Sequence, residues 1–256
     1  MIRVAGLKRQ VRNNVNELTT DGMNAREQRN EIYKTLVPLV DEQYRIFNEE
    51  IVPQLKVNDV AFVAYSELNE DDKMIVNSYF EDELFPVLTP LAIDNVHPFP
   101  NLINRSLALA IILDDPDTEQ VEEKVCVIQL PNNISRFYSI GSNGEFRFIL
   151  LEEIIKANVD KLFPGMRTLD SFAFRITRNA DLDLEEEEAD DLLTLIEEEV
   201  KKRRLGILVR LEVDKKMPDN LLNFLTNALR TENNEIYRIN GPLNLGDFMS
   251  ICKIEK

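Results

Sequence analysis

The spacing of apolar residues changes near Pro53, and this change limits the folds open to the chain. Before it, apolar residues recur every three or four positions, which is the period of one face of an α-helix. After it, short apolar runs separated by turn residues predominate, which is the pattern of β-strands. The sequence therefore predicts an α+β chain: a helical part over residues 1–57 and a mixed or antiparallel-sheet α+β domain over residues 58–256.

The first 57 residues are expected to form two antiparallel helices. The first ends at Thr19-Thr20-Asp21-Gly22 and carries an apolar stripe made of Leu7, Val11, Val15 and Leu18. The second runs from Ile32 to Ile51, and Pro38 is expected to bend it. Two helices bury only one face each, and the helical pattern is already under way at Met1. We therefore expect this hairpin to be the remnant of a three-helix, bundle-like domain.

The remaining residues alternate strand-like and helix-like patterns. A short buried segment at 60–65 precedes a helix that starts at Leu68 and stops near Phe85-Pro86. Four apolar runs then predict an antiparallel meander: 107–113, 125–130, 137–140 and 146–150. A strand, helix, strand unit is expected at 172–177, 184–204 and 207–213, followed by a helix at 218–229 and a short strand near Ile236.

The net charge of −16 comes mostly from one segment. Residues 181–199 hold eleven Asp or Glu and no Lys or Arg, and without them 35 acidic residues face 30 basic ones. We interpret this run as a solvated helix face rather than a metal or cationic-partner site. A broad nucleic-acid-binding surface is excluded, because it needs a net basic face and this chain offers only short basic clusters.

Targeting and redox signals are both weak. No apolar run approaches the roughly 18 residues that span a bilayer, and the amino terminus has no apolar stretch followed by a cleavage site, so we expect no membrane span and a cytoplasmic location. Cys126 and Cys252 fit no paired framework. Cys126 lies in an apolar run, which favours a reduced thiol in the core.

His97 is the only histidine, and it is the one candidate for acid–base chemistry. It could act with Asp94 as a general base, but the surrounding Pro98 and Pro100 favour a stiff loop in which the imidazole satisfies backbone groups. A single histidine without nearby cysteines does not make a zinc site. Neither of the two glycine-rich phosphate-binding patterns, G-x-x-x-x-G-K-[ST] and G-x-G-x-x-G, occurs.

Two basic clusters remain. Lys201 to Arg204 ends the expected acidic helix, where cations compensate the helix dipole, and we favour that structural interpretation. Lys8, Arg9 and Arg12 lie beside the first apolar stripe and are expected to contact either a missing part of the protein or an anionic chain.

One continuous stretch resembles a known family. It reads ELFPVLTPLA at 83–92, HPFP at 97–100 and NLINRSL at 101–107, and it is similar to the middle domain of the polyphosphate kinases. The resemblance extends over essentially the whole chain through further segments: Met1–Lys8, which resembles the end of a family amino-terminal helix, Arg175–Asp181, Val209–Val213, Met217-Pro218 and Tyr237–Leu243.

The resemblance implies an enzyme that reversibly moves the terminal phosphate of ATP onto inorganic polyphosphate, through a phosphohistidine and with magnesium. It implies a helical amino-terminal domain, a middle domain and two carboxy-terminal domains related to phospholipase D, assembled as dimers or larger oligomers. The family's phosphorylated histidine and its magnesium and phosphate ligands lie in the last two domains, so His97 receives no such role. We therefore expect residues 1–57 to belong to the amino-terminal domain and residues 58–256 to be the middle domain, with no catalytic, cofactor-binding or metal-binding residue in either.

The resemblance also implies the partners. They are the catalytic domains of the kinase and a second copy in a homodimer, with inorganic polyphosphate as a further candidate along the polymer channel. ATP and magnesium are expected to bind the full-length enzyme and not this segment. An alternative is a stand-alone interaction or regulatory module that pairs with a full-length kinase. Only this alternative requires the chain to form a stable complex when it is mixed with an intact family enzyme.

Overall fold

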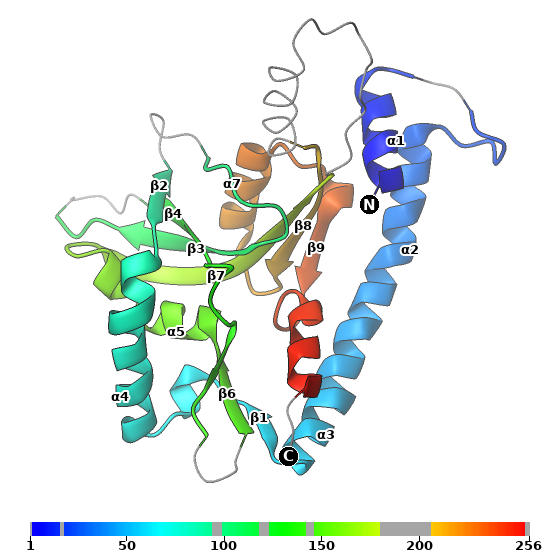
Figure 1. Cartoon of the computed structure of the whole chain (residues 1–256). Helices are drawn as coiled ribbons and strands as arrows, with labels where there is room; N and C mark the ends of the chain where they lie inside the picture. Colours follow the sequence, from blue (N-terminus) through cyan, green and yellow to red (C-terminus); the bar gives the residue numbers. More distant parts are fainter. Residues whose placement is uncertain are drawn as a thin grey trace, which may run out of the picture.

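The computed structural model describes residues 2–15, 18–93, 99–117, 123–141, 146–179 and 206–253. A column of helices from the amino-terminal part forms one side of the molecule, and two β-sheets with shorter helices around them form the other (Figure 1). The architecture is α+β, with amino-terminal helices followed by mixed sheets, as the sequence predicts.

The first helix lies earlier in the chain than predicted. The helical column consists of α1 (Ile2–Arg12), α2 (Ala25–Ile46), the π-helical turn η1 (Phe47–Ile51) and α3 (Val52–Val57). α1 ends at Arg12 because Asn14 adopts a left-handed conformation, with φ 54°, and the N–H of Val15 donates to the Gln10 carbonyl at 2.9 Å. Val15 and Leu18 therefore lie outside the helix and are exposed, instead of completing its apolar stripe.

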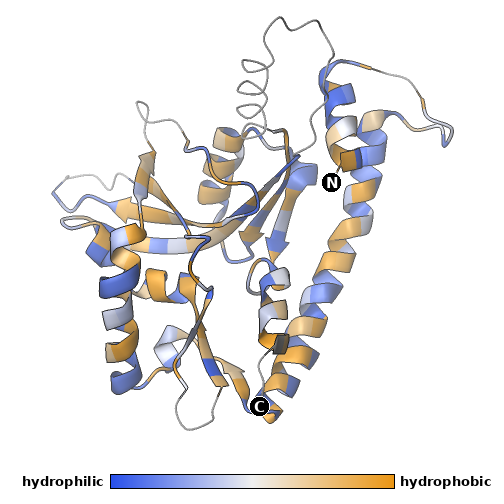
Figure 2. Ribbon diagram, in the orientation of Figure 1, coloured by the Kyte–Doolittle hydropathy of each residue, from blue (hydrophilic) through white to orange (hydrophobic). Residues whose placement is uncertain are grey.

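A capping box starts α2. The Asn24 side chain accepts from the Glu27 N–H at 3.0 Å, and the Glu27 carboxylate accepts from the Asn24 N–H at 2.8 Å, so two otherwise unpaired backbone donors are satisfied. The helix continues through Pro38 to Ile46. Apolar and polar residues alternate along α2 (Figure 2), and Tyr33, Leu36, Val37 and Val40 pack against the core.

The larger sheet has six strands in the order β2-β4-β3-β7-β8-β9. Its strands are β2 (Pro90–Ile93), β3 (Leu107–Asp114), β4 (Lys124–Gln129), β7 (Arg167–Arg178), β8 (Leu208–Asp214) and β9 (Ile236–Ile239). β8 and β9 pair in parallel, and the other neighbours are antiparallel. The amino-terminal helices pack against the β8–β9 end of this sheet: α1 contacts β8, and α2 contacts β9.

The expected meander is divided between two sheets. β3 and β4 pair as predicted, but β5 (Phe137–Ser139) and β6 (Phe146–Leu150) form a separate three-stranded sheet with β1 (Val60–Phe62). β1 pairs in parallel with β6, and the sequence pattern indicated only a short buried segment there. Hydrophobic period predicts that a segment is a strand but not which strand it pairs with, which accounts for the error.

Strand β3 is buried on both faces. Leu109 and Ile111 face a core shared with α4 (Glu70–Tyr79) and α5 (Leu151–Ala157), whereas Ala108 and Ala110 face a second core shared with α7 (Asp219–Leu229). The small alanines leave room for the leucines of α7, which begins after Pro218. The short helical turns that complete the chain are η2 (Tyr65–Glu67), η3 (Phe80–Leu84), η4 (Phe85–Val87), η5 (Val159–Leu162), η6 (Asn233–Glu235) and η7 (Leu245–Lys253).

Candidate functional site

A buried ion-pair cluster joins the amino-terminal helices to the sheet. The Lys8 ammonium, on α1, lies 2.6 Å from the Glu235 carboxylate and also donates to the Leu208 carbonyl at 2.9 Å. Arg29, on α2, reaches the same Glu235 at 2.8 Å and Glu232 at 3.1 Å. The side chains of Lys8 and Arg29 are each 2% exposed, and that of Glu235 is 0% exposed. One buried carboxylate thus holds a cation from each of the two helices.

The sequence predicted a different position for Lys8. It was expected, with Arg9 and Arg12, to face a missing part of the protein or an anionic chain, but Lys8 is buried and paired within the chain. Burial lowers the pKa of Lys8, although the hydrogen bond and charge of Glu235 act in the opposite direction. Lys8 is therefore a structural residue and is unavailable to an external anion.

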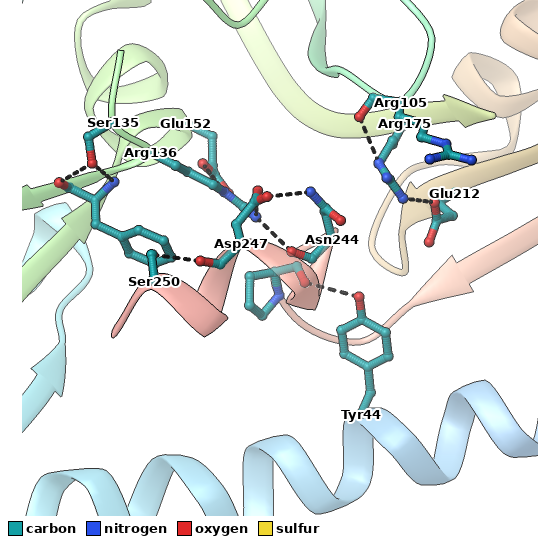
Figure 3. A network of polar contacts seen from close by, with 12 residues as sticks. Tyr44, Arg105, Ser135, Arg136, Glu152, Arg175, Glu212, Asn244, Asp247 and Ser250 are labelled. Carbon is teal, nitrogen blue, oxygen red and sulfur yellow. Dashed lines mark hydrogen bonds and ion pairs between the residues drawn. The ribbon is translucent and has the colours of Figure 1, made fainter. Parts of the chain in front are cut away.

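A cleft of about 550 Å³ opens between the turn after β4 and η7. Its lining includes the charged and polar residues Arg105, Asn132, Ser135, Arg136, Asp247 and Ser250. Figure 3 shows how Arg136, directly before β5, meets Glu152 of α5 and Asp247 of η7. The cleft lies where the three-stranded sheet, the six-stranded sheet and η7 come together (Figure 1).

Arg136 is the centre of this arrangement, and each of its three side-chain nitrogens is hydrogen-bonded within the protein. Its Nε lies 3.1 Å from Glu152, its Nη1 lies 2.9 Å from Asp247, and the same nitrogen donates to the Asn244 carbonyl at 3.2 Å. Its Nη2 contacts Glu152 as well. Burial lowers the pKa of Arg136, but the charges and hydrogen bonds of Glu152 and Asp247 outweigh that effect and raise it. Arg136 therefore fixes η7 to β5 and α5.

Arg105 differs from Arg136 because its side chain has no hydrogen bond or ion pair with another residue in the described part of the chain. It is exposed, and its backbone is left-handed with φ 67°. Arg175 lies behind it: its Nε donates to the Arg105 carbonyl at 2.9 Å, and its Nη1 lies 2.9 Å from Glu212 (Figure 3). Of these two cleft-lining residues, Arg136 is held by ion pairs, whereas the Arg105 side chain has none with the described residues.

Several predicted features fall outside the described residues. They are His97 with Asp94, the acidic run 181–199 and the basic cluster 201–204. Over the ranges that the structure describes, no group of three His, Cys, Asp or Glu side chains could hold a metal ion. A search of the same ranges finds no helix long and apolar enough to cross a membrane.

Sequence reasoning missed Arg105 and Arg136. Arg136 is a single charge directly before a short strand, and nothing in the neighbouring sequence indicates that Glu152 and Asp247 converge on it. Arg105 appears in the sequence only within the stretch NLINRSL, whose resemblance to a family carried no role for this residue. Its left-handed backbone is a property of the folded loop.

Comparison with known proteins gives a consistent result along the chain. The model described as "Polyphosphate kinase N-terminal domain" matches residues 1–63, and that described as "Polyphosphate kinase middle domain" matches residues 71–251. The polyphosphate kinase of Thermosynechococcus vestitus is 40% identical over 98% of this chain and 35% of its own length. That of Aphanizomenon baltica is 41% identical over 96% of this chain and 66% of its own length.

The crystal structure of polyphosphate kinase from Porphyromonas gingivalis superposes with a TM-score of 0.72, at 23% sequence identity, over 88% of this chain and 32% of that one. This likeness supports the fold. The chain spans about a third of the length of the Thermosynechococcus and Porphyromonas proteins that it resembles.

Proposed function

The chain belongs to the polyphosphate kinase family, and from this premise we propose that it forms the non-catalytic amino-terminal and middle portion of such an enzyme. The whole enzyme would reversibly transfer the terminal phosphate of ATP to inorganic polyphosphate. In this proposal ATP and magnesium bind the catalytic domains, and this portion packs against those domains and shapes the channel that holds the polymer.

The observation that carries this proposal is the buried cluster of Lys8, Arg29 and Glu235. Residues 1–63 and 71–251 match two separate domain models, yet Glu235 of the second pairs with cations on both helices of the first. Removing one member of such a buried cluster leaves an uncompensated charge, so the two parts resist separation. A rigid joint of this kind suits a scaffold that must hold a catalytic site in register, because catalysis of phosphoryl transfer depends mainly on positioning.

The direct test is an activity assay on the purified chain. Given ATP, magnesium and a polyphosphate primer, it should make no polymer. Measurable synthesis that depends on this chain would overturn the proposal. A second arm adds the catalytic domains as a separate polypeptide, and recovery of synthesis only in the mixture would support a scaffold role.

We also propose that this portion contributes to a homodimer, and the face around β2 is the candidate surface. β2 is an edge strand that pairs only with β4 in the described part of the chain, so its other side offers unpaired backbone groups. Phe85, Val87 and Leu91 lie on or just before this strand and are 45%, 48% and 38% exposed. A second copy could pair with the same strand about a two-fold axis and cover these side chains.

Sedimentation velocity tests this surface. Leu91→Lys places a charge on the edge strand and should shift the chain from dimer to monomer at micromolar concentration. Leu39→Lys is the matched control, because Leu39 is 60% exposed on α2, away from β2, and should leave the dimer intact. A monomeric wild type, or equal effects of the two variants, would contradict the proposal.

A further inference from the structure

Helix α4 and the two turns that follow it expose a cluster of large apolar side chains. Val76, Phe80 and Leu84 recur every four positions and are buried, so they define the inward side of this segment. Figure 1 shows α4 on the side of the molecule opposite the helical column. Four large apolar residues of the same segment are exposed by 62%, 52%, 45% and 48%, respectively: Met74, Ile75, Phe85 and Val87.

The outer side of α2 provides a contrast. Leu39 is 60% exposed there, but it is accompanied by charged side chains such as those of Glu42 and Arg45, which pair with each other. Single exposed apolar residues are normal, whereas a cluster of them marks a surface that another molecule or domain covers. We call Met74, Ile75 and Phe85 the α4 strip, and its composition is that of an interaction surface.

Acidic side chains flank the α4 strip. Residues 70–84 contain six Asp or Glu and one Lys. Two cations come from other elements, since Arg147 lies 3.0 Å from Asp72 and Lys161 pairs with Glu81. Six carboxylates thus face three cations, and the net charge is −3. Three of the carboxylates have no side-chain partner in the described ranges: Asp71, Asp82 and Glu83.

These charges restrict what can cover the strip. A second copy of the same strip would bring like charges together, so the strip is not complementary to itself. The occupant must instead be apolar and basic. This chain spans 35% of the length of the Thermosynechococcus polyphosphate kinase, so most of an enzyme of that length lies outside these 256 residues. That remaining polypeptide is the available source of such an occupant.

We propose that the α4 strip docks a basic amphipathic helix from the remaining polypeptide of the polyphosphate kinase. Apolar side chains of that helix cover Met74, Ile75 and Phe85, and its Lys or Arg side chains face the unpaired carboxylates. The source of the helix rests on the proposed function, whereas its chemistry rests on the strip. The homodimer face around β2 adjoins the strip at Phe85.

A synthetic peptide tests the chemistry of the strip on the 256-residue chain. The probe is a fluorescein-labelled helix of about 18 residues, or five turns, with Leu on one face and Lys on the other. Fluorescence anisotropy at about 0.15 M salt measures its binding. Ile75→Ser should weaken binding roughly 10-fold, because it removes most of one apolar side chain from the contact.

Leu39→Ser is the matched control. Leu39 is also an exposed apolar residue on a helix with acidic neighbours, but it lies on α2, so its replacement should leave binding unchanged. Equal weakening by the two variants would mean non-specific attraction and would overturn the surface. A peptide with Glu in place of every Lys should bind far more weakly, and equal binding of the two peptides would overturn the charge complementarity.

Methionine oxidation by hydrogen peroxide tests the source of the helix. In the 256-residue chain, Met74 and Met249 are 62% and 66% exposed and should oxidise at similar rates, whereas Met217 is 1% exposed and should react slowly. In the whole enzyme, Met74 should react roughly 10-fold more slowly than it does in this chain, because the docked helix covers it.

The outcomes of the oxidation experiment separate the possible occupants. Met74 that reacts equally fast in the chain and in the whole enzyme would overturn the proposal, even if the peptide binds. Protection of Met74 that disappears when the whole enzyme is diluted would mean that a second copy covers the strip, and would overturn it too. Failure of the whole enzyme to make polyphosphate would instead overturn the proposed function.

Discussion

Lys8 and Glu235 lie 227 positions apart in sequence, yet the ammonium of one is 2.6 Å from the carboxylate of the other, and both side chains are buried. Arg29 shares the same carboxylate. The amino-terminal helices are therefore fixed to the sheet by a charge cluster that water does not screen. Substituting one of its three members should change the unfolding free energy far more than substituting a surface ion pair does.

Glu235→Gln should destabilise the protein strongly. The substitution keeps the shape of the side chain but leaves the buried Lys8 without a counter-charge and Arg29 with only the half-exposed Glu232, which costs roughly 3–5 kcal/mol of unfolding free energy. Denaturant unfolding measures the loss. Glu31→Gln is the control, since it removes the exposed partner of Lys34 and should change the unfolding free energy by no more than about 0.5 kcal/mol. Similar small losses for both variants would refute the structural role of the cluster.

Arg136→Lys should not behave as a conservative change. A lysine ammonium cannot contact Glu152, Asp247 and the Asn244 carbonyl together, as the guanidinium does, so roughly 2–4 kcal/mol of unfolding free energy should be lost. Hydrogen exchange should speed up in η7, which loses its attachment to β5 and α5.

Arg45→Lys provides the comparison for Arg136→Lys. Arg45 also contacts several carboxylates, those of Glu42, Glu49 and Glu50, but all four side chains are substantially exposed. Its replacement should cost no more than about 1 kcal/mol. If exchange in η7 were unchanged in Arg136→Lys, the proposed anchoring of η7 would be wrong.

The sequence predicted most elements because their hydrophobic periods are regular. The run at 107–113 became β3, and the pattern from 218 to 229 became α7, beginning at Asp219. The end of α1 was misplaced because Val15 continues the helical period, whereas the left-handed Asn14 stops the helix. A local backbone preference outweighed the period there.

Strand pairing and buried charges were much less predictable. Nothing in the period of β6 indicates that it pairs with β1 rather than with β4. Lys8 lies next to two arginines, so it resembles part of a surface cluster, and its burial depends on a carboxylate from a distant turn. The cleft was not predictable for the same reason, since Arg105, Arg136 and Asp247 come from three separate segments.

Two glycines should respond in opposite directions to alanine. At Gly241, with φ 152°, an added Cβ would lie 3.0 Å from Tyr44 Cδ1, so Gly241→Ala should lose roughly 1–3 kcal/mol of unfolding free energy. At Gly6, inside α1, the added Cβ meets nothing within 4 Å, and Gly6→Ala should gain about 0.5–1 kcal/mol. Thermal melting should show a lower melting temperature for Gly241→Ala and a higher one for Gly6→Ala. A stabilised Gly241→Ala would show that the contact of Gly241 with Tyr44 of α2 is loose.

The two cysteines should differ sharply in reactivity with pH. Burial raises the pKa of the Cys126 thiol to about 11, while Cys252 is exposed. At pH 8.5 iodoacetamide should therefore label Cys252 rapidly and reach Cys126 only when the protein unfolds. A Cys252→Ser variant lets the labelling of Cys126 be followed by itself.

Because the folded pKa of Cys126 lies above its unfolded value of 9.0, the thiol's contribution to stability is full below pH 9 and should be lost as the pH rises toward 11. Cys126→Ala should flatten that part of the stability profile, and rapid labelling of Cys126 in the folded protein would contradict its place in the core.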